Sequence, residues 1–388
     1  MKFPLLLRII TAILLGIAIG SIASEQIVEL FATFTGLFGN FLSFVIPLII
    51  LGFIAPGIGS MGRGAGKLLG ITTGLAYGST IAAGVLAFIT ASSIYPGLLQ
   101  GQSAQQLENP EESLIEASFT VEMEPIMGVM AALIFSFILG LGIASLKSDA
   151  LLNVMNDFRS IIQKVIEKVI IPLLPFHIFG IFANMTYAGQ VGTILSVFAK
   201  VFVMIILLHI AYLVAMYGIA GGLQRINPFK MIRTMLPAYF TALGTQSSAA
   251  TIPVTLKRVK KVGAREHVAD FSVPLLATVH LAGSTITITS CAMAVMYMQG
   301  QSLVFGDIFP FILMLGVTMI AAPGVPGGAV MAAIGLLESM LGFGATMTSL
   351  MIALYLAQDS FGTATNVTGD GAITMIADRL TGGKVNQN

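Results

Sequence analysis

Long apolar segments recur along the whole chain, and each is long enough to cross the hydrocarbon core of a bilayer. A crossing helix needs about 20 predominantly apolar residues. Only 10% of the 388 residues are charged, against roughly 25% in an average soluble domain, so the chain cannot cover a water-facing globule. We predict an all-α polytopic membrane protein with eight spanning helices, near residues 4–23, 37–57, 68–98, 126–146, 158–187, 193–222, 270–298 and 346–377.

Composition excludes several classes of partner and site. The formal net charge is +1, so global charge indicates no nucleic-acid partner. Cys291 is the only cysteine, which excludes an intrachain disulfide and a cysteine metal cluster.

Residues 1–24 resemble a signal peptide, but Arg8 and the many later spans favour a retained first helix.

The distribution of charge predicts an orientation. Segment 99–125 holds six glutamates and no lysine or arginine, and we interpret it as a solvated external linker. Basic residues flank the other ends of the adjacent helices, as at Lys67, Lys147 and Arg159. The positive-inside rule therefore places these basic flanks in the cytoplasm, and we predict both termini on that side.

Residues 227–262 do not fit an ordinary span. Basic residues stand at both ends, and only 23 residues separate Arg233 from Lys257, too few to cross twice. The centre, GTQSSAATIP, is small and polar, as suits two half-helices that meet at a tip. Such backbone is tolerated inside a membrane only against protein or water. We predict a re-entrant hairpin that enters from the cytoplasm.

A second irregular region, residues 303–345, contains AAPGVPGGAV and no lysine or arginine. Two prolines within four residues make a continuous helix unfavourable there. We predict a second re-entrant hairpin, entering from outside; two kinked ordinary spans are the alternative. Two interrupted segments of this kind indicate the substrate site of a transporter.

The helix predicted at 68–98 carries glycines at four-residue intervals. Gly70, Gly74 and Gly78 would lie on one face. Such a stripe permits close approach of a neighbouring backbone, so we predict helix packing there.

The last apolar segment carries one polar stripe. Asp359, Thr363, Asn366 and Asp370 are spaced 4, 3 and 4 residues apart and fall on one face of a helix. An aspartate at the centre of a spanning helix costs about 2.5–3.5 kcal/mol. The neighbouring spans offer almost no lysine or arginine as a partner, so we expect a bound metal cation or a substrate ammonium.

The chemistry of the stripe assigns roles to its members. Na⁺ prefers hard oxygen ligands, which Asp370 and Asn366 offer. Asp359 can neutralise an amino group, and half-helix N-termini at the hairpin tips suit a carboxylate. Together these groups predict an amino-acid site.

Four motifs in this order resemble the dicarboxylate/amino acid:cation symporters, the glutamate-transporter-like family. They are TQSSAATIPV (245–254), ATVHLAGSTITIT (277–289), APGVPGGA (322–329) and QDSFGTATNVTGD (358–370). The resemblance implies eight spans, two hairpins and a homotrimer with an elevator mechanism. It assigns residues 1–66 and 101–192 to a scaffold, and residues 67–100 and 193–388 to a transport domain.

The resemblance also implies individual roles. Asp359 would bind the substrate amine, Thr363 the substrate, Asn366 its carboxylate and Asp370 the sodium ion. Further substrate contacts would be Ser247, Ser248, Ser284, Gly362 and the gating tip Gly324, Val325, Pro326 and Gly327. Further sodium ligands would be His280, Thr278 and Ala322, several of them through backbone carbonyls.

Departures from the family pattern narrow the substrate. Acidic-substrate members have an arginine where this chain has Gly362, and many have another where it has Gln246. A glycine cannot replace the bidentate fork that holds a side-chain carboxylate. Ala282 replaces an aspartate that binds an additional sodium in other members. We therefore expect a small neutral substrate such as serine, threonine or alanine, as in the bacterial sodium/serine–threonine symporter branch.

His280, where family members commonly have asparagine, leaves alternatives open. Its side chain is either a neutral hydrogen-bonding group or a proton-coupling group; the second alternative would make the protein a proton-coupled or uncoupled exchanger. A cystine or dicarboxylate substrate is a weaker variant. A membrane enzyme is remote, because the chain has neither G-x-S-x-G nor H-E-x-x-H.

Overall fold

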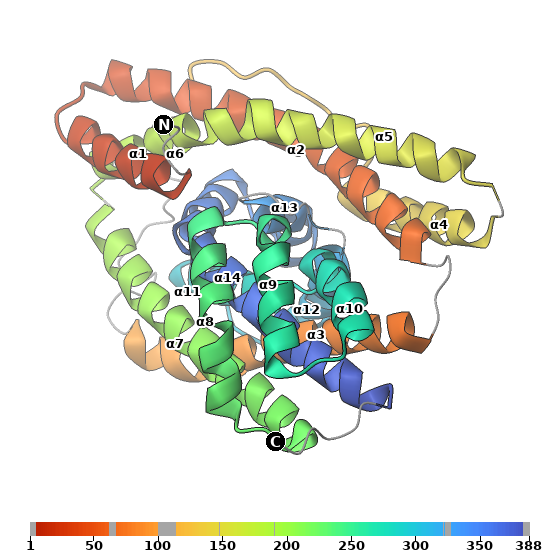
Figure 1. Cartoon of the computed structure of the whole chain (residues 1–388). Helices are drawn as coiled ribbons and strands as arrows, with labels where there is room; N and C mark the ends of the chain where they lie inside the picture. The colour runs from red at the N-terminus through yellow and green to blue at the C-terminus, as the bar shows by residue number, and fades with distance from the viewer. Residues whose placement is uncertain are drawn as a thin grey trace.

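The computed structural model describes residues 5–61, 67–99, 114–146, 148–189, 191–320, 322 and 327–382, and every regular element in this part of the chain is a helix. One group of helices forms the layer across the top of Figure 1. In it α2 packs on α4, α5 and α6, and α1 packs on α6. The bounds are α1 Leu5–Gly20, α2 Glu25–Met61, α4 Val129–Ser145, α5 Ala150–Val165, the π-helix η1 Ile166–Ile170 and α6 Ile171–Tyr187.

The second group lies below this layer and is built around α14 (Figure 1). Helix α14 packs against α3, α7, α8, α9, α10 and α11, and most of its side chains are buried. The bounds are α3 Lys67–Leu98, α7 Val191–Gln224, α8 Pro228–Thr245, α9 Ser248–Val262, α10 Glu266–Val279, α11 Ala282–Met298, α12 Phe305–Ile320, α13 Gly328–Leu341 and α14 Ala345–Leu380.

Two helix pairs occupy the irregular regions. Helices α8 and α9 pack on each other and are separated only by Gln246 and Ser247, within the polar centre of the 227–262 segment. Gln246 ends α8 in the left-handed region, with φ 53°, and the Ser247 hydroxyl accepts from the backbone N–H of Ala250 at the start of α9. Helices α12 and α13 pair in the same way.

The structure corrects two predicted helices. The 270–298 segment is not one helix: α10 ends at Val279, α11 begins at Ala282, and His280 and Leu281 lie between them in non-helical conformations. The segment predicted at 37–57 begins earlier, at Glu25, because α2 also includes residues 25–36, a stretch that contains two glutamates. Residues 323–326, which include Pro323, lie outside the described residues.

Within the described residues, five helices have the length and composition to cross a membrane, namely Glu25–Gly59, Lys67–Leu98, Ala150–Tyr187, Ile194–Gln224 and Glu266–Met298. The last of these spans the break between α10 and α11. The apolar stretches Leu7–Gly20, Ile134–Ser145, Phe305–Ile320 and Gly328–Leu341 are shorter. The chain is therefore a multi-pass membrane protein, and the number eight stays a prediction.

The packing prediction for the glycine stripe of α3 is wrong. Gly70, Gly74 and Gly78 are exposed, and a Cβ atom on any of them would meet nothing within 4 Å. The close approach on α3 lies further along the helix, where a Cβ on Gly84 would lie 2.5 Å from Ile312 of α12. Four-residue spacing identifies a face, but it does not tell which face packs.

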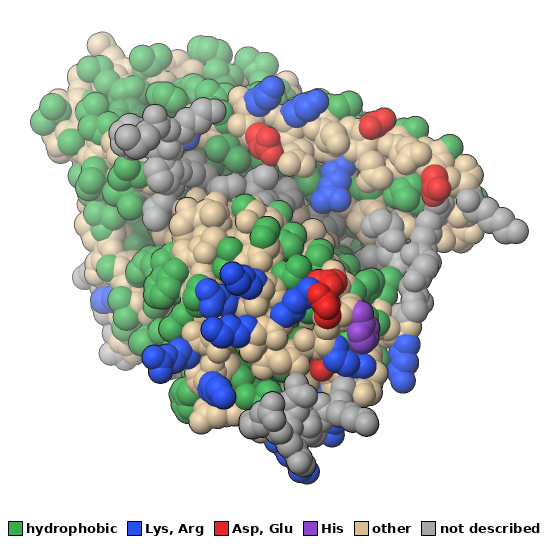
Figure 2. Space-filling view, in the orientation of Figure 1, with side chains coloured by type: hydrophobic (Ala, Val, Ile, Leu, Met, Phe, Trp, Pro, Cys, Tyr) green, Lys and Arg blue, Asp and Glu red, His purple; other side chains and the backbone are tan. Residues whose placement is uncertain are grey.

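The surface divides by chemistry. Lys and Arg side chains gather over α8 and α9 in Figure 2, among them the exposed Lys230, Arg233, Lys257 and Lys261. Large apolar side chains are exposed along α1, α4 and α7. Apolar surface of this extent needs lipid or protein around it. The basic end of the α8–α9 pair fits the predicted cytoplasmic side, and the orientation remains a prediction.

A buried carboxylate near the C-terminal end of α14 forms an ion pair with an arginine of another helix. Asp378 accepts from Nε of Arg265 at 2.6 Å, and Nη2 of Arg265 donates to the Asp378 carbonyl and the Thr381 hydroxyl, each at 2.9 Å. Asp378 is almost fully buried. The guanidinium thus joins the start of α10 to the end of α14 with charge-assisted hydrogen bonds.

We expect Arg265→Ala to lower the melting temperature of the purified protein, with a loss of about 1–3 kcal/mol, because it leaves the Asp378 carboxylate buried without a donor. Thermal unfolding in detergent measures it. Lys260→Ala is the matched control, because Lys260 pairs only with exposed Glu266 and Asp270 and should change little. Equal losses in the two variants would contradict this role.

Candidate functional site

The first turn of α11 is capped by a side chain of another helix. Asn366 of α14 accepts from the backbone N–H groups of Gly283 and Ser284 through Oδ1, at 2.7 and 3.2 Å. Its Nδ2 donates to the Ser284 hydroxyl at 3.0 Å. A helix start has N–H groups without intrahelical partners, and Leu281 at the N-cap supplies no side-chain acceptor. Asn366 therefore holds the end of α11 against α14.

Gly283 allows this contact. A Cβ on Gly283 would collide with the carbonyl oxygen of Gly362 and with the Thr365 side chain. Gly362 is less confined, since its Cβ would meet Thr287 and Ser284 at ordinary contact distances. On the other side, Nε2 of the buried His209 lies 3.0 Å from the Gly283 carbonyl oxygen. His209 thus supports the helix crossing.

Asp359 meets the start of another half-helix. The backbone N–H of Gly327 donates to its Oδ2 at 2.7 Å, immediately before α13 begins at Gly328. Gly327 has φ +76°, a conformation that favours glycine. A carboxylate at this position is favoured by the helix dipole as well as by the hydrogen bond. The Asp359 carboxylate is thereby bound to the tip region of the α12–α13 pair.

Tyr355, one turn before Asp359, is a site residue that the sequence analysis missed. Its hydroxyl donates to Oδ1 of Asp359 at 2.7 Å and lies 3.2 Å from the Ser284 hydroxyl. Asp359 and Asn366 are therefore linked through Tyr355 and Ser284. The signal was its i−4 spacing from Asp359, which places it on the polar face.

Asp370 pairs with His280, the residue at the break between α10 and α11. Nδ1 of His280 lies 2.8 Å from Oδ1 of Asp370, and both side chains are fully buried. Nε2 lies 3.2 Å from the Ser79 hydroxyl and 3.3 Å from the Tyr212 hydroxyl. A neutral ring that donates from Nδ1 and accepts at Nε2 satisfies both sides. Ser79 and Tyr212 were missed, because no pattern in α3 or α7 marks them.

Residues 5–380 match the sodium:dicarboxylate symporter family, which is nearly the whole chain. The chain belongs to this family. Its members are symporters rather than enzymes, so the expected absence of enzymatic activity is confirmed. The resemblance carried by the four motifs is confirmed as well.

Curated relatives agree with the family over the full length. Proteins named serine/threonine transporter SstT from Acinetobacter baumannii strains AYE, AB307-0294 and AB0057 are each 26% identical to this chain over 403 aligned residues. The alignment covers 97% of this chain and 97% of each relative. This symporter-family member therefore aligns with those transporters over nearly its whole length.

The remaining predicted site residues of the symporter are placed as follows. Ser247 and Ser248 lie at the junction of α8 and α9, Thr363 is buried on the polar stripe, and Ala322 is buried between α12 and α13. Thr278 is exposed, and its hydroxyl donates to the Leu275 carbonyl in its own helix rather than to Asp370. Gly324, Val325 and Pro326 lie outside the described residues.

A sodium ion would find few charged ligands in this symporter. Among the described residues no group of three or more His, Cys, Asp or Glu could hold a metal ion. Asp370 would then supply the one carboxylate, and neutral oxygens the other ligands, which suits a monovalent hard cation. These roles stay predictions.

We expect Gly283→Ala to destabilise the protein by about 1–3 kcal/mol, because the added methyl group would push α11 away from Gly362 and stretch the Asn366 hydrogen bonds. The melting temperature measures this loss. Gly74→Ala is the matched control, since a Cβ there meets nothing within 4 Å. If both variants melt at the same temperature, the crossing does not depend on Gly283.

Proposed function

We propose that the protein carries a small neutral amino acid, of the serine, threonine or alanine kind, across a bacterial or archaeal cytoplasmic membrane together with Na⁺. The observation that carries this proposal is the Asp359 carboxylate, which is buried at the start of α13. The Tyr355 hydroxyl links this carboxylate to the Ser284 hydroxyl. A carboxylate in this place attracts a substrate ammonium, and the start of a helix suits the substrate carboxylate.

The surroundings of the stripe support a neutral substrate. Among the described residues, no lysine or arginine is buried. An acidic substrate would bring a second carboxylate into this site without a cation to pair it, which is costly. The glycine at 362 faces Ser284 and Thr287 and provides no such cation. The curated relatives are named serine/threonine transporters, and serine and threonine are neutral amino acids. A dicarboxylate or cystine substrate is thereby disfavoured.

Coupling would act through the two ends of the stripe. Asp359 binds the tip of the α12–α13 pair through Gly327, and Asp370 lies three turns along the same helix beside the α10–α11 break. We propose that substrate at Asp359 and Na⁺ at Asp370 together set the position of this tip. The second helix group would move as the transport domain against the first group as scaffold, in a homotrimer.

One observation favours a second candidate, proton coupling. Nδ1 of His280 lies 2.8 Å from Oδ1 of Asp370. The ring thus takes a position at this carboxylate oxygen where a sodium ion would otherwise bind. A histidine paired with a carboxylate can act as a proton shuttle. Transport driven by a proton gradient would follow if protonation of this pair, rather than Na⁺ binding, preceded the movement.

We expect serine uptake into proteoliposomes to follow an inward Na⁺ gradient and not a proton gradient. Asp370→Asn should lower Na⁺-driven uptake at least about tenfold, because a neutral amide replaces the one charged ligand. Asp270→Asn, at an exposed aspartate, is the matched control. Normal Na⁺-driven uptake in Asp370→Asn would contradict the cation site. Uptake driven by a proton gradient and lost in His280→Asn would favour the second candidate.

A further inference from the structure

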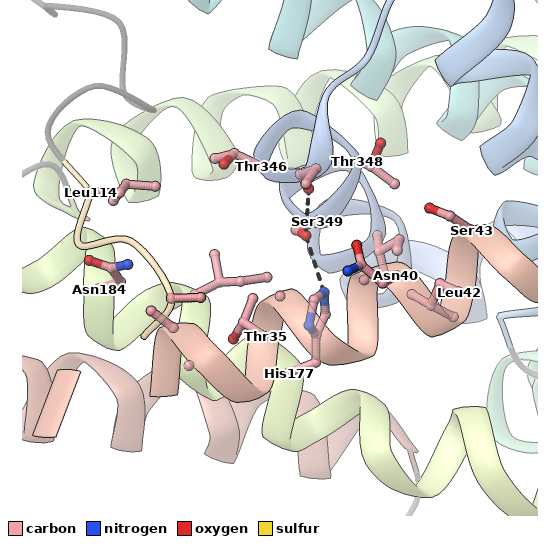
Figure 3. Close-up of a pocket in the computed structure, with 18 of the residues that line it drawn as sticks. Thr35, Asn40, Leu42, Ser43, Leu114, His177, Asn184, Thr346, Thr348 and Ser349 are labelled. Atoms are coloured by element: carbon pink, nitrogen blue, oxygen red, sulfur yellow. Dashed lines mark hydrogen bonds between the residues drawn. The ribbon is translucent and has the colours of Figure 1, made fainter. Parts of the chain in front are cut away.

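A cavity of about 410 Å³ lies between the two helix groups and contains no residue of the α14 polar stripe. Figure 3 shows its walls: α2 and α6 on one side, α14 on the other, and the segment that begins at Leu114 at one edge. Its volume falls within the range of small-molecule sites, roughly 300–1,000 Å³.

The cavity joins elements of both groups. Nε2 of His177 on α6 lies 3.1 Å from the hydroxyl of Ser349 on α14, and that hydroxyl donates to the Ala345 carbonyl at 2.7 Å (Figure 3). Since the Ser349 proton is committed to Ala345, Nε2 of His177 is the donor in this pair. A ligand in the cavity would therefore contact both groups at once.

The lining combines apolar and polar side chains with two carboxyl groups. Leu42, Ile181, Ile334 and Ile352 form apolar walls, and Glu338 of α13 contributes a half-buried carboxylate. No lysine or arginine lines the cavity, and Glu338 forms no ion pair with a described residue. Glu116, on the neighbouring segment, adds a second carboxylate. Such a site repels an anion and leaves a carboxylate for a cation.

A transition-metal ion does not fit this chemistry, because it needs several charged or imidazole ligands together, and the described residues form no such group. A sodium ion has no use for the apolar walls. An ammonium needs only one carboxylate and nearby polar groups, and the apolar walls suit a hydrocarbon body attached to it. The lining thus matches a molecule with one protonated amine and one compact apolar part.

We propose that this cavity is a second ligand site, which takes a small amphipathic amine with its ammonium at Glu338. A molecule bound there bridges the two helix groups and hinders their relative movement, so it inhibits transport without competing with the amino acid at Asp359. The inhibitory part of this inference rests on the proposed transport function; the binding part does not.

The test uses 2-phenylethylamine, with 2-phenylethanol as the neutral analogue of the same shape, and follows the melting temperature of the purified full-length protein. The amine should raise the melting temperature with concentration, and the alcohol should raise it less. Glu338→Gln should weaken the apparent affinity for the amine about tenfold or more, because the charge-assisted contact is lost. Glu266→Gln, at an exposed glutamate, should leave it unchanged.

A second variant fills the cavity and keeps its charge. Gly39 lines the cavity, and a Cβ there meets nothing within 4 Å, so Gly39→Leu should block the amine without a clash at its first side-chain atom. Serine with Na⁺ should still raise the melting temperature of both variants, which shows that they are folded. If serine fails to stabilise the unmodified protein, the proposed function fails, whatever the amine does.

Two results would overturn the amine site. One is equal stabilisation by the amine in the unmodified protein and in Glu338→Gln. The other is inhibition of serine uptake that disappears at high serine, since that competition would place the amine at Asp359. Inhibition that lowers the maximal rate and leaves the serine concentration for half-maximal uptake unchanged supports the site.

Discussion

The contact between Asn366 and the first turn of α11 is the interaction on which the rest of the site depends. It ends the irregular stretch at His280 and Leu281, and it fixes α11 against the centre of α14. Because α11 starts here, His280 is held beside Asp370 and Ser284 beside Tyr355. The absence of a side chain at Gly283 allows the two backbones to come this close.

The polar stripe of α14 uses helix ends as partners. Two buried aspartates need compensation, and each finds it where a neighbouring helix is interrupted. Asp359 receives the N–H of Gly327 at the start of α13, and Asp370 receives the ring of His280 between α10 and α11. Interrupted helices therefore supply donors to buried carboxylates, and in the proposed function their tips also respond to the ligand.

Much of this could be predicted from the sequence. The long apolar segments indicated the helices, and the polar centre near Gln246 marked the junction of α8 and α9. The 4-3-4 spacing identified a stripe of polar side chains that is buried on one helix. The break after Val279 could not be predicted from hydropathy, because His280 and Leu281 leave an otherwise apolar run intact. Its cause lies in Asn366, more than 80 residues away.

Partners that come from other helices were also beyond the sequence. Ser79 and Tyr212 reach His280 from α3 and α7 only because those helices pack on the same side of α14. Tyr355 could have been found, since it precedes Asp359 by one turn. The glycine stripe of α3 shows the opposite error, where a clear pattern predicted packing on a face that the fold leaves open.

The central claim is that Asp359 anchors the amino group of a neutral amino acid in a sodium-dependent site. Calorimetric titration of the purified protein with serine tests it most directly, comparing the unmodified chain with Asp359→Asn in sodium and in potassium buffers. We predict binding to the unmodified chain in sodium only, and none to Asp359→Asn. Serine binding of equal affinity in both proteins would contradict the account.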